Sequence, residues 1–340
     1  MWVVINHFQA YLKAVFGELN WLMPVIDRGY FGVDLFFCLS GFIIAYVYFE
    51  KFVRNSKDKK KEIQQFLLKR FARIYPVYFI TTLVAMFIFT FARLIGHKFY
   101  NIPDSSLTFI VIFKNLMAIQ ILDNSPSLNY PAWSVSAEFF AYLLFPLFVY
   151  SLFVKFKSTR LIAGILLPLS LLVYECSLFL DVLKNDIVIR VLSEFVMGVA
   201  SYLLIKGVNV RRNHIVLIRF LITSSFIISI YAIKNNLILS TFMPLLLLGF
   251  IAANYFHNIP NKGLGRRILV KLGLWSFSLY LTHGLIHYFL GGFDLPIHTN
   301  DIFLRGFQLF IIIWVTLLTA KLTTEAFENP CRRYLIKKLG

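Results

Sequence analysis

The stretch VDLFFCLSGFIIAYVYFE, residues 33–50, carries charge only at Asp34 and Glu50 and is long enough to cross a bilayer as a helix. Similar apolar blocks recur along the chain, in which 59% of the 340 residues are hydrophobic and only 15% are charged. Soluble proteins are roughly 45–50% apolar and about a quarter charged. This composition excludes disorder, a collagen-like chain and a coiled coil. We expect an all-α, polytopic integral membrane protein.

Apolar runs between charge clusters predict about ten transmembrane helices, of which the first is the weakest because polar residues interrupt it. We expect the charge run 51–62 to be a loop, and residues 97–132 to form the one long loop on the opposite face. The predicted helices cover residues 1–17, 33–50, 74–96, 133–153, 161–179, 187–205, 215–233, 236–256, 273–291 and 302–324.

Positive charge is concentrated on one side of this arrangement. The loops that share a side with both termini carry 24 Lys and Arg and three acidic residues. The opposite loops carry five Lys and Arg and nine acidic residues. The positive-inside rule therefore predicts that both termini are cytoplasmic. A basic side that faces the cytosol and anionic lipid explains the net charge of +17 without a nucleic-acid partner.

A few ionisable residues fall at membrane depth, where a charge costs on the order of several kcal/mol unless it is paired or hydrated. Arg190 and Glu194, four residues apart on one predicted helix, are interpreted as a structural ion pair. Ionisable groups on different helices more often mark a reaction or transport path, and we place His7, Asp34, Glu138 and His283 in that class.

A metal site is not expected. His283 and His287 lie one helical turn apart and could bind zinc, but no third ligand is evident. Cys38, Cys176 and Cys331 are far apart in the chain and form no CxxC motif, which also excludes a disulfide framework.

Four stretches mix polar and apolar residues in ways that a lipid-facing helix does not need. In the second of them, Arg70 and Arg73 lie on one helical face at the predicted cytosolic end of the helix. Two guanidinium groups there suit a phosphate-binding pair, and on physical grounds they suit a lipid-headgroup anchor equally well. The stretches are GVDLFFCLSGF (32–42), KRFARIYP (69–76), WSVSAEFFAYLLFP (133–146) and SFSLYLTH (276–283).

In order and spacing these motifs resemble the acyltransferase-3 family, the polytopic enzymes that O-acylate glycans and other acceptors at bacterial membranes. ENPCR (328–332) is similar to the closing motif of the family, so the resemblance covers nearly the whole chain, 1–340, as one domain. The WSVSAEFF form is most similar to the branch that modifies exopolysaccharide and lipopolysaccharide O-antigen. The resemblance implies a multi-pass O-acetyltransferase of the bacterial cytoplasmic (inner) membrane. Its donor would be acetyl-CoA, its acceptor a glycan or lipid-linked saccharide, and it would have no resident cofactor.

The N-terminus departs from the family pattern, in which Arg or Lys precedes a histidine of the first helix by ten residues. Residues 3–8, VVINHF, resemble the end of that pattern, and His7 then matches the catalytic histidine. We expect the N-terminal half of this helix to be missing, and we expect no C-terminal SGNH domain of the kind that some members carry.

The chemistry suggests roles for the site residues. A neutral imidazole that removes the proton of a sugar hydroxyl accelerates its attack by ~10²–10⁴. We assign this role to His7, with Glu138 or Asp34 orienting its ring or stabilising the imidazolium, and an acyl-histidine intermediate is equally compatible. By the resemblance, Arg70 and Arg73 would bind the phosphates of acetyl-CoA.

Four further residues, Arg28, Trp133, Tyr280 and His283, are candidates for lining the passage of the acceptor or the acyl group. The main alternative is a transporter or flippase with an intramembrane carboxylate–histidine path. A non-catalytic subunit descended from the enzyme is a third possibility. Consumption of acetyl-CoA would separate the enzyme from both.

Overall fold

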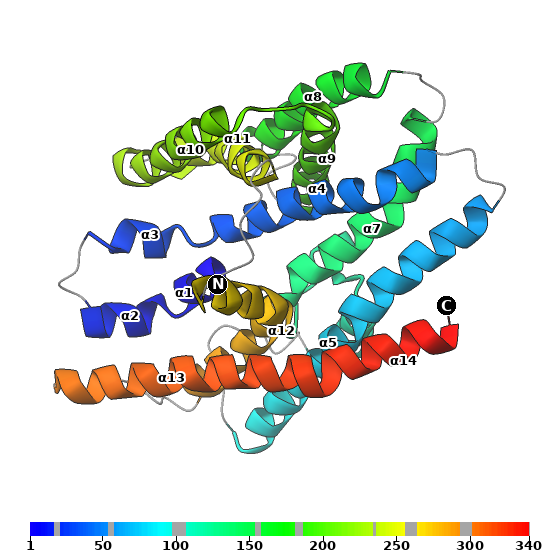
Figure 1. The fold of residues 1–340 in the computed structure, drawn as a ribbon. Helices are drawn as coiled ribbons and strands as arrows, with labels where there is room; N and C mark the ends of the chain where they lie inside the picture. The colour runs from blue at the N-terminus through cyan, green and yellow to red at the C-terminus, as the bar shows by residue number, and fades with distance from the viewer. Residues whose placement is uncertain are drawn as a thin grey trace. The chain divides into compact units, whose positions relative to one another are not determined.

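The computed structural model describes residues 1–16, 21–53, 58–96, 107–153, 158–180, 186–233, 236–255, 264–292 and 301–339. Within these ranges the regular elements are all helices (Figure 1). Nine helices in the described ranges are long and apolar enough to cross a membrane. The prediction of an all-α, polytopic membrane protein is confirmed.

The elements follow one another with short connections. In chain order they are α1 (Trp2–His7), α2 (Gln9–Phe16), α3 (Met23–Asp27), α4 (Phe31–Val53), α5 (Lys59–Leu94), α6 (Phe109–Leu116), the 3₁₀ turn η2 (Gln120–Asp123), α7 (Ala132–Leu152), α8 (Thr159–Phe179), α9 (Ile187–Ile205), α10 (Arg212–Ala232), α11 (Asn236–Tyr255), α12 (Leu264–Gly292), α13 (Ile302–Leu322), the π-helical turn η3 (Thr323–Glu328) and α14 (Asn329–Leu339).

The predicted first helix, 1–17, is wrong as a single element. It is divided at Phe8 into α1 and α2, and neither piece is long enough to cross a bilayer. Phe8 is buried in a hydrophobic cluster with Val4, Leu279 and Ile312. The ring of Phe8, the residue directly after His7, therefore packs against α12 and α13.

The predicted loops at 51–62 and 97–132 contain more helix than expected. α4 continues to Val53 and α5 already begins at Lys59, with residues 54–57 outside the described ranges. With 36 residues, α5 is about 54 Å long and exceeds a hydrocarbon core of about 30 Å. Its basic first turns can therefore extend beyond the bilayer, which is why a charge run can be helical here.

Helical structure also extends beyond the predicted boundaries in the segment 97–132 and at two later helices. The segment 97–132 contains α6 and η2, α12 begins before the predicted position 273, and the last helix continues past 324 through η3 and α14. α13, η3 and α14 form one continuous rod, orange to red in Figure 1. Apolar runs thus marked the membrane-spanning part of these helices and missed their polar extensions.

The chain divides into two compact units, to which α5 and α7 both contribute. The first unit contains residues 1–29, 65–139 and 261–340, and the second contains 30–64 and 140–260. In the first unit α12 packs against α13 and α1, and α1 packs against α3. In the second unit α9 packs against α4 and α8.

Two glycines set the closest helix contact of the second unit. A Cβ atom on Gly41 of α4 would lie 2.0 Å from the Phe195 carbonyl oxygen, and one on Gly198 of α9 would lie 2.0 Å from that of Cys38. Small residues allow membrane helices to approach until their backbones touch. The GVDLFFCLSGF motif therefore has a packing function in addition to its acidic residue.

Candidate functional site: a histidine pair

Two histidines far apart in the sequence meet in the first unit. His7 is the last residue of α1, and its Nδ1 lies 2.8 Å from Nε2 of His283 on α12. The rings are nearly parallel, with centroids 5.0 Å apart. His283 is fully buried at 0% exposure, whereas His7 is half-buried, so His7 is the more exposed member of the pair.

The hydrogen bonds of the pair determine where its protons lie. Nδ1 of His283 is 3.1 Å from the Leu279 carbonyl oxygen, which can only accept a hydrogen bond. In the neutral ring, Nε2 of His283 is then an acceptor, so His7 must donate to it from Nδ1. His7 is left with an unprotonated Nε2. This tautomer is inferred from the bonding pattern, and it gives His7 a nitrogen that can accept a proton or attack a carbonyl.

Aromatic rings surround the pair. Tyr130 meets the His7 ring edge-on at 5.3 Å between centroids, and Tyr280 lies 5.7 Å from His283. The Phe8 ring lies edge-on to the rings of His283 and His287, with centroid distances of 6.4 and 6.0 Å. Nδ1 of His287, one turn beyond His283, is buried without a hydrogen-bonding partner among the described residues. Aromatic rings and a third imidazole therefore lie around the histidine pair.

The short helix α1 is held by α3. Asn6 donates to the carbonyl oxygens of Ile26 and Asp27 at 2.9 and 3.0 Å, and the Trp2 indole donates to that of Val25 at 2.7 Å. Arg28, a predicted passage residue, directly follows this contact as the C-cap of α3. These bonds orient His7 although its helix has only six residues.

Residues 129–131, just before α7, also contact the site. Asn129 donates to the Leu281 carbonyl at 2.9 Å, and the Tyr130 amide donates to the Tyr288 hydroxyl at 3.1 Å. A Cβ atom on Gly284 would lie 2.6 Å from Cδ of Pro131 and 2.8 Å from Oδ1 of Asn129. Only glycine lets α12 come this close to the segment that carries Tyr130.

The stretch between α6 and this segment is ordered by buried polar contacts. Asn115 donates to the Pro126 carbonyl at 2.8 Å and accepts from the Leu128 amide at 2.9 Å. Nearer the surface, hydrogen bonds from Lys114 and Ser125 lower the pKa of the Asp123 carboxyl. Such contacts replace the regular backbone pairing that a long connection lacks.

Glu138 lies in the first unit, on the same helix as the Ser134 that contacts Tyr280. It is 5% exposed and follows Ser134 by one turn of α7. Ser134 and Tyr280 share a hydrogen bond of 2.7 Å between their hydroxyl groups, and Glu138 interacts electrostatically with Tyr280. Trp133 precedes Ser134 in the first turn of α7. Among the described residues the hydrogen-bonding partner of the His7 ring is His283. The orienting role assigned to Glu138 or Asp34 stays a prediction.

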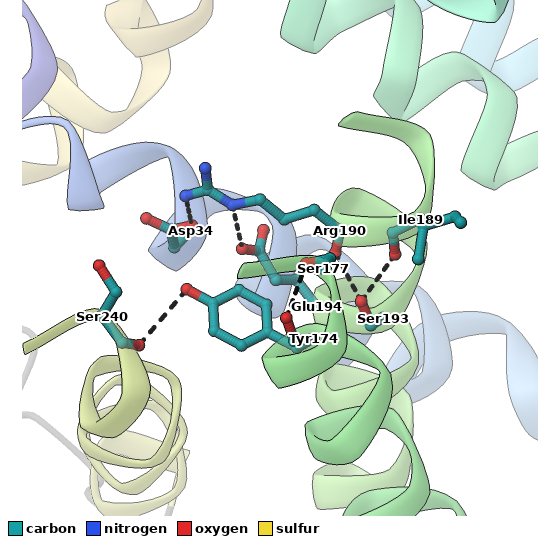
Figure 2. A network of polar contacts seen from close by, with 8 residues as sticks. All are labelled: Asp34, Tyr174, Ser177, Ile189, Arg190, Ser193, Glu194 and Ser240. Atoms are coloured by element: carbon teal, nitrogen blue, oxygen red, sulfur yellow. Dashed lines mark hydrogen bonds and ion pairs between the residues drawn. The ribbon is translucent and has the colours of Figure 1, made fainter. Parts of the chain in front are cut away.

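Asp34 is part of an ion network inside the second unit (Figure 2). Arg190 of α9 pairs with Asp34 of α4 and, through Nε, with Glu194 at 3.3 Å. Asp34 and Glu194 are both 1% exposed. The predicted Arg190–Glu194 pair is confirmed, and Asp34 joins it. The catalytic role assigned to Asp34 stays a prediction.

Arg70 and Arg73 lie on α5 within the first unit, the unit that also contains the histidine pair. Arg73 is exposed and Arg70 is half-buried. Among the described residues, no group of three His, Cys, Asp or Glu side chains could hold a metal ion.

Tyr130 was not singled out from the sequence. His283 was placed with His7 on a reaction or transport path and among the passage residues, but its hydrogen bond to His7 was not predicted. The signal for His283 was its motif, SFSLYLTH, because a histidine at membrane depth needs a partner. Tyr130 lies three residues before the motif that begins at Trp133, but no spacing rule links it to His7.

The fold and this site are those of a multi-pass membrane protein in which a half-buried and a fully buried imidazole are hydrogen-bonded to each other. The chain belongs to the acyltransferase-3 family, since the family model described as "Acyltransferase domain" matches residues 1–324. It is therefore a membrane-bound acyltransferase. The predicted resemblance and the predicted enzyme class are both confirmed.

The chain is similar to three curated proteins. It is 27% identical over 341 residues to acyltransferase MdmB of Streptomyces mycarofaciens, covering 92% of this chain and 84% of that protein. It is 28% identical over 149 residues to peptidoglycan O-acetyltransferase OatA of Listeria monocytogenes, covering 42% of this chain and 23% of OatA. An uncharacterized protein of Haemophilus influenzae is 28% identical over 138 residues, covering 38% of this chain and 53% of that protein. No solved structure matches the chain.

Proposed function

We propose that this protein is an O-acetyltransferase of the bacterial cytoplasmic membrane that moves an acetyl group from acetyl-CoA to a hydroxyl of an extracytoplasmic glycan. Its base is Nε2 of His7, and His283 positions that base. The observation that carries the proposal is the chain of hydrogen bonds from the Leu279 carbonyl through His283 to His7. This series of hydrogen bonds leaves one nitrogen of the half-buried His7 ring unprotonated among aromatic side chains.

The reaction balances without a cofactor. Nε2 of His7 removes the proton of the acceptor hydroxyl as its oxygen attacks the thioester carbonyl carbon. The C–S bond breaks, and the proton passes to the thiolate, so the products are an ester and CoA thiol. In the two-step variant Nε2 itself attacks the thioester carbonyl carbon, and the C–S bond breaks to release the CoA thiolate. The acceptor hydroxyl then attacks the acetyl group, the C–N bond to the imidazole breaks, and the hydroxyl proton passes to the thiolate, so the products are the same ester and CoA thiol.

The choice of a glycan acceptor is supported by the similarity to OatA, whose name describes O-acetylation of peptidoglycan. The family membership favours acyl transfer over transport. The bacterial membrane is supported by the bacterial origin of the relatives.

The proposal is tested with purified protein in lipid nanodiscs, ¹⁴C-acetyl-CoA and a panel of bacterial glycans. We expect alkali-labile label in one glycan class, reduced ~10²–10⁴-fold in His7→Ala. His214→Ala is the matched control, because His214 is exposed and belongs to the second unit, whereas the histidine pair belongs to the first. Equal transfer by His7→Ala and the parent would refute the role of His7. Absence of acetyl-CoA consumption by the parent with every acceptor would refute the proposed function.

A further inference from the structure

The short segment directly before α7 carries one exposed aromatic side chain. Tyr130 is 56% exposed, whereas residues 128–129 and 131–132 on either side of it are buried. Exposure alone would need no functional explanation, because single apolar side chains are common on protein surfaces. The position of this ring is what matters, since it lies edge-on to the ring of His7, the proposed base, with centroids 5.3 Å apart.

Contacts on both sides of Tyr130 hold its backbone in place. Its amide donates a hydrogen bond of 3.1 Å to the Tyr288 hydroxyl. The preceding Asn129 is fully buried and donates to the Leu281 carbonyl at 2.9 Å. The following Pro131 restricts the backbone of Tyr130 to extended conformations. The backbone that carries the exposed ring is therefore tied to α12, the helix that also carries one histidine of the pair.

An exposed ring on a fixed backbone suits a ligand that has a flat apolar face. A tyrosine side chain has only two rotatable χ angles, so it offers a large contact surface at a low cost in conformational entropy. Because the backbone is already ordered, less freedom is lost when a ligand binds. Covering the exposed part of the Tyr130 ring with an apolar surface removes both surfaces from water, which is favourable.

A pyranose sugar has such a face. Its C–H groups form the apolar faces of the ring, and its hydroxyl groups project outward around the rim. A sugar stacked on Tyr130 would bury one C–H face and leave its rim hydroxyls directed toward the side chains beside the tyrosine. His7 is one of these side chains. Stacking and proton removal can therefore act on the same sugar unit.

We propose that Tyr130 is the sugar-stacking residue of the acceptor site, where its exposed ring holds a pyranose unit of the glycan with one hydroxyl at Nε2 of His7. This inference rests on the proposed function, because the acceptor is taken to be a glycan. An exposed tyrosine of a membrane protein can instead serve as an anchor at the membrane surface. The experiment separates the two roles.

The first test compares Tyr130→Ala with Tyr130→Phe, which keeps the ring. Tyr334→Ala is the matched control, because Tyr334 of α14 is 60% exposed. The assay uses nanodiscs, ¹⁴C-acetyl-CoA and soluble oligosaccharides prepared from bacterial peptidoglycan and O-antigen. We expect Tyr130→Ala to raise KM for the oligosaccharide roughly tenfold, the effect of losing one aromatic contact. KM for acetyl-CoA stays within about twofold, and Tyr130→Phe and Tyr334→Ala behave like the parent.

Three results of this assay would overturn the stacking role. The first is an unchanged KM for the oligosaccharide in Tyr130→Ala. The second is a rise in this KM that Tyr130→Phe shares, because the ring would then not be the binding element. The third is a lower yield of inserted Tyr130→Ala protein together with an unchanged KM, which would assign Tyr130 to membrane anchoring.

Binding of the same oligosaccharides to the His7→Ala protein, titrated by saturation-transfer NMR, separates this proposal from the proposed function. We expect one oligosaccharide class to bind, roughly tenfold more weakly when Tyr130→Ala is added and with parent affinity when Tyr334→Ala is added. That result supports the stacking role even if no glycan is acetylated. Equal affinity of the two double variants, or binding of no oligosaccharide, would overturn it.

Discussion

At the scale of single residues, the reactivity of His7 depends on which ring nitrogen carries the proton. The Leu279 carbonyl fixes the proton of His283 on Nδ1, and His283 in turn fixes that of His7 on Nδ1. A chain of this kind presents a base in the correct tautomer without a carboxylate next to it. In Ser–His–Asp enzymes the aspartate has the same orienting role, and loss of the correct tautomer costs them about 10⁴ in kcat.

We predict that His283→Leu lowers kcat at least about tenfold, because the His7 ring can then rotate or adopt the other tautomer. His283→Gln retains a side-chain oxygen that can accept from His7 and recovers part of the loss. The measurement is steady-state transfer to the glycan acceptor in the parent and in a His7→Ala background. If His283 acts through His7, then His283→Leu has no further effect in His7→Ala. An additive effect would contradict the relay.

At the scale of secondary-structure elements, α12 organises the first unit. Within two turns it carries Ser278, the aromatic Tyr280, and His283, and it approaches the Tyr130 segment at Gly284. The second unit relies on the same physical device, since Gly41 and Gly198 allow α4 and α9 to touch. Glycine is used here for close approach and not for flexibility.

We predict that Gly284→Ala lowers kcat/KM by up to about 100-fold while the protein still folds, because displacement of a reacting group by about 1 Å can have an effect of this size. The added methyl would push away Pro131 and Asn129, and with them Tyr130. Gly273→Ala on the same helix is the matched control, since a Cβ atom there meets nothing within 4 Å. Kinetics and thermal unfolding should be measured on both. Equal activity of the two variants would show that the close contact does not matter for transfer.

At the scale of the whole molecule, the distribution of charge predicts the orientation of the protein in the membrane. The basic loops alternate with neutral or acidic ones along the entire chain. In that orientation η2 faces the outside, and α14 faces the cytosol. The ion network of Asp34, Arg190 and Glu194 stabilises the second unit internally.

We predict that a membrane-impermeant thiol reagent applied to intact cells labels Leu122→Cys but not Lys337→Cys in a background without native cysteines. Both side chains are exposed, so accessibility to water does not distinguish them. After permeabilisation both should be labelled. The reverse pattern would invert the topology.

The sequence by itself determined the class of fold, because about 20 consecutive apolar residues have few stable arrangements other than a membrane helix. It also identified the family, since the motifs are local strings that need no structure to be read. Predicted helix ends were the weaker part. Hydropathy marks only the portion of a helix inside the lipid, so the polar extensions of α5 and α12 and the rod continuing through η3 and α14 were missed.

Only the tertiary structure decided which polar side chains of different helices pair with one another. His7 and His283 are 276 residues apart, and Ser278 and Glu328 are 50 apart. Sequence periodicity shows which residues share a face of one helix, but which faces meet depends on how side chains of several helices pack together. For the same reason Asp34, a carboxylate at membrane depth, could be predicted to need a partner, while the choice of Arg190 required the packing of α4 against α9.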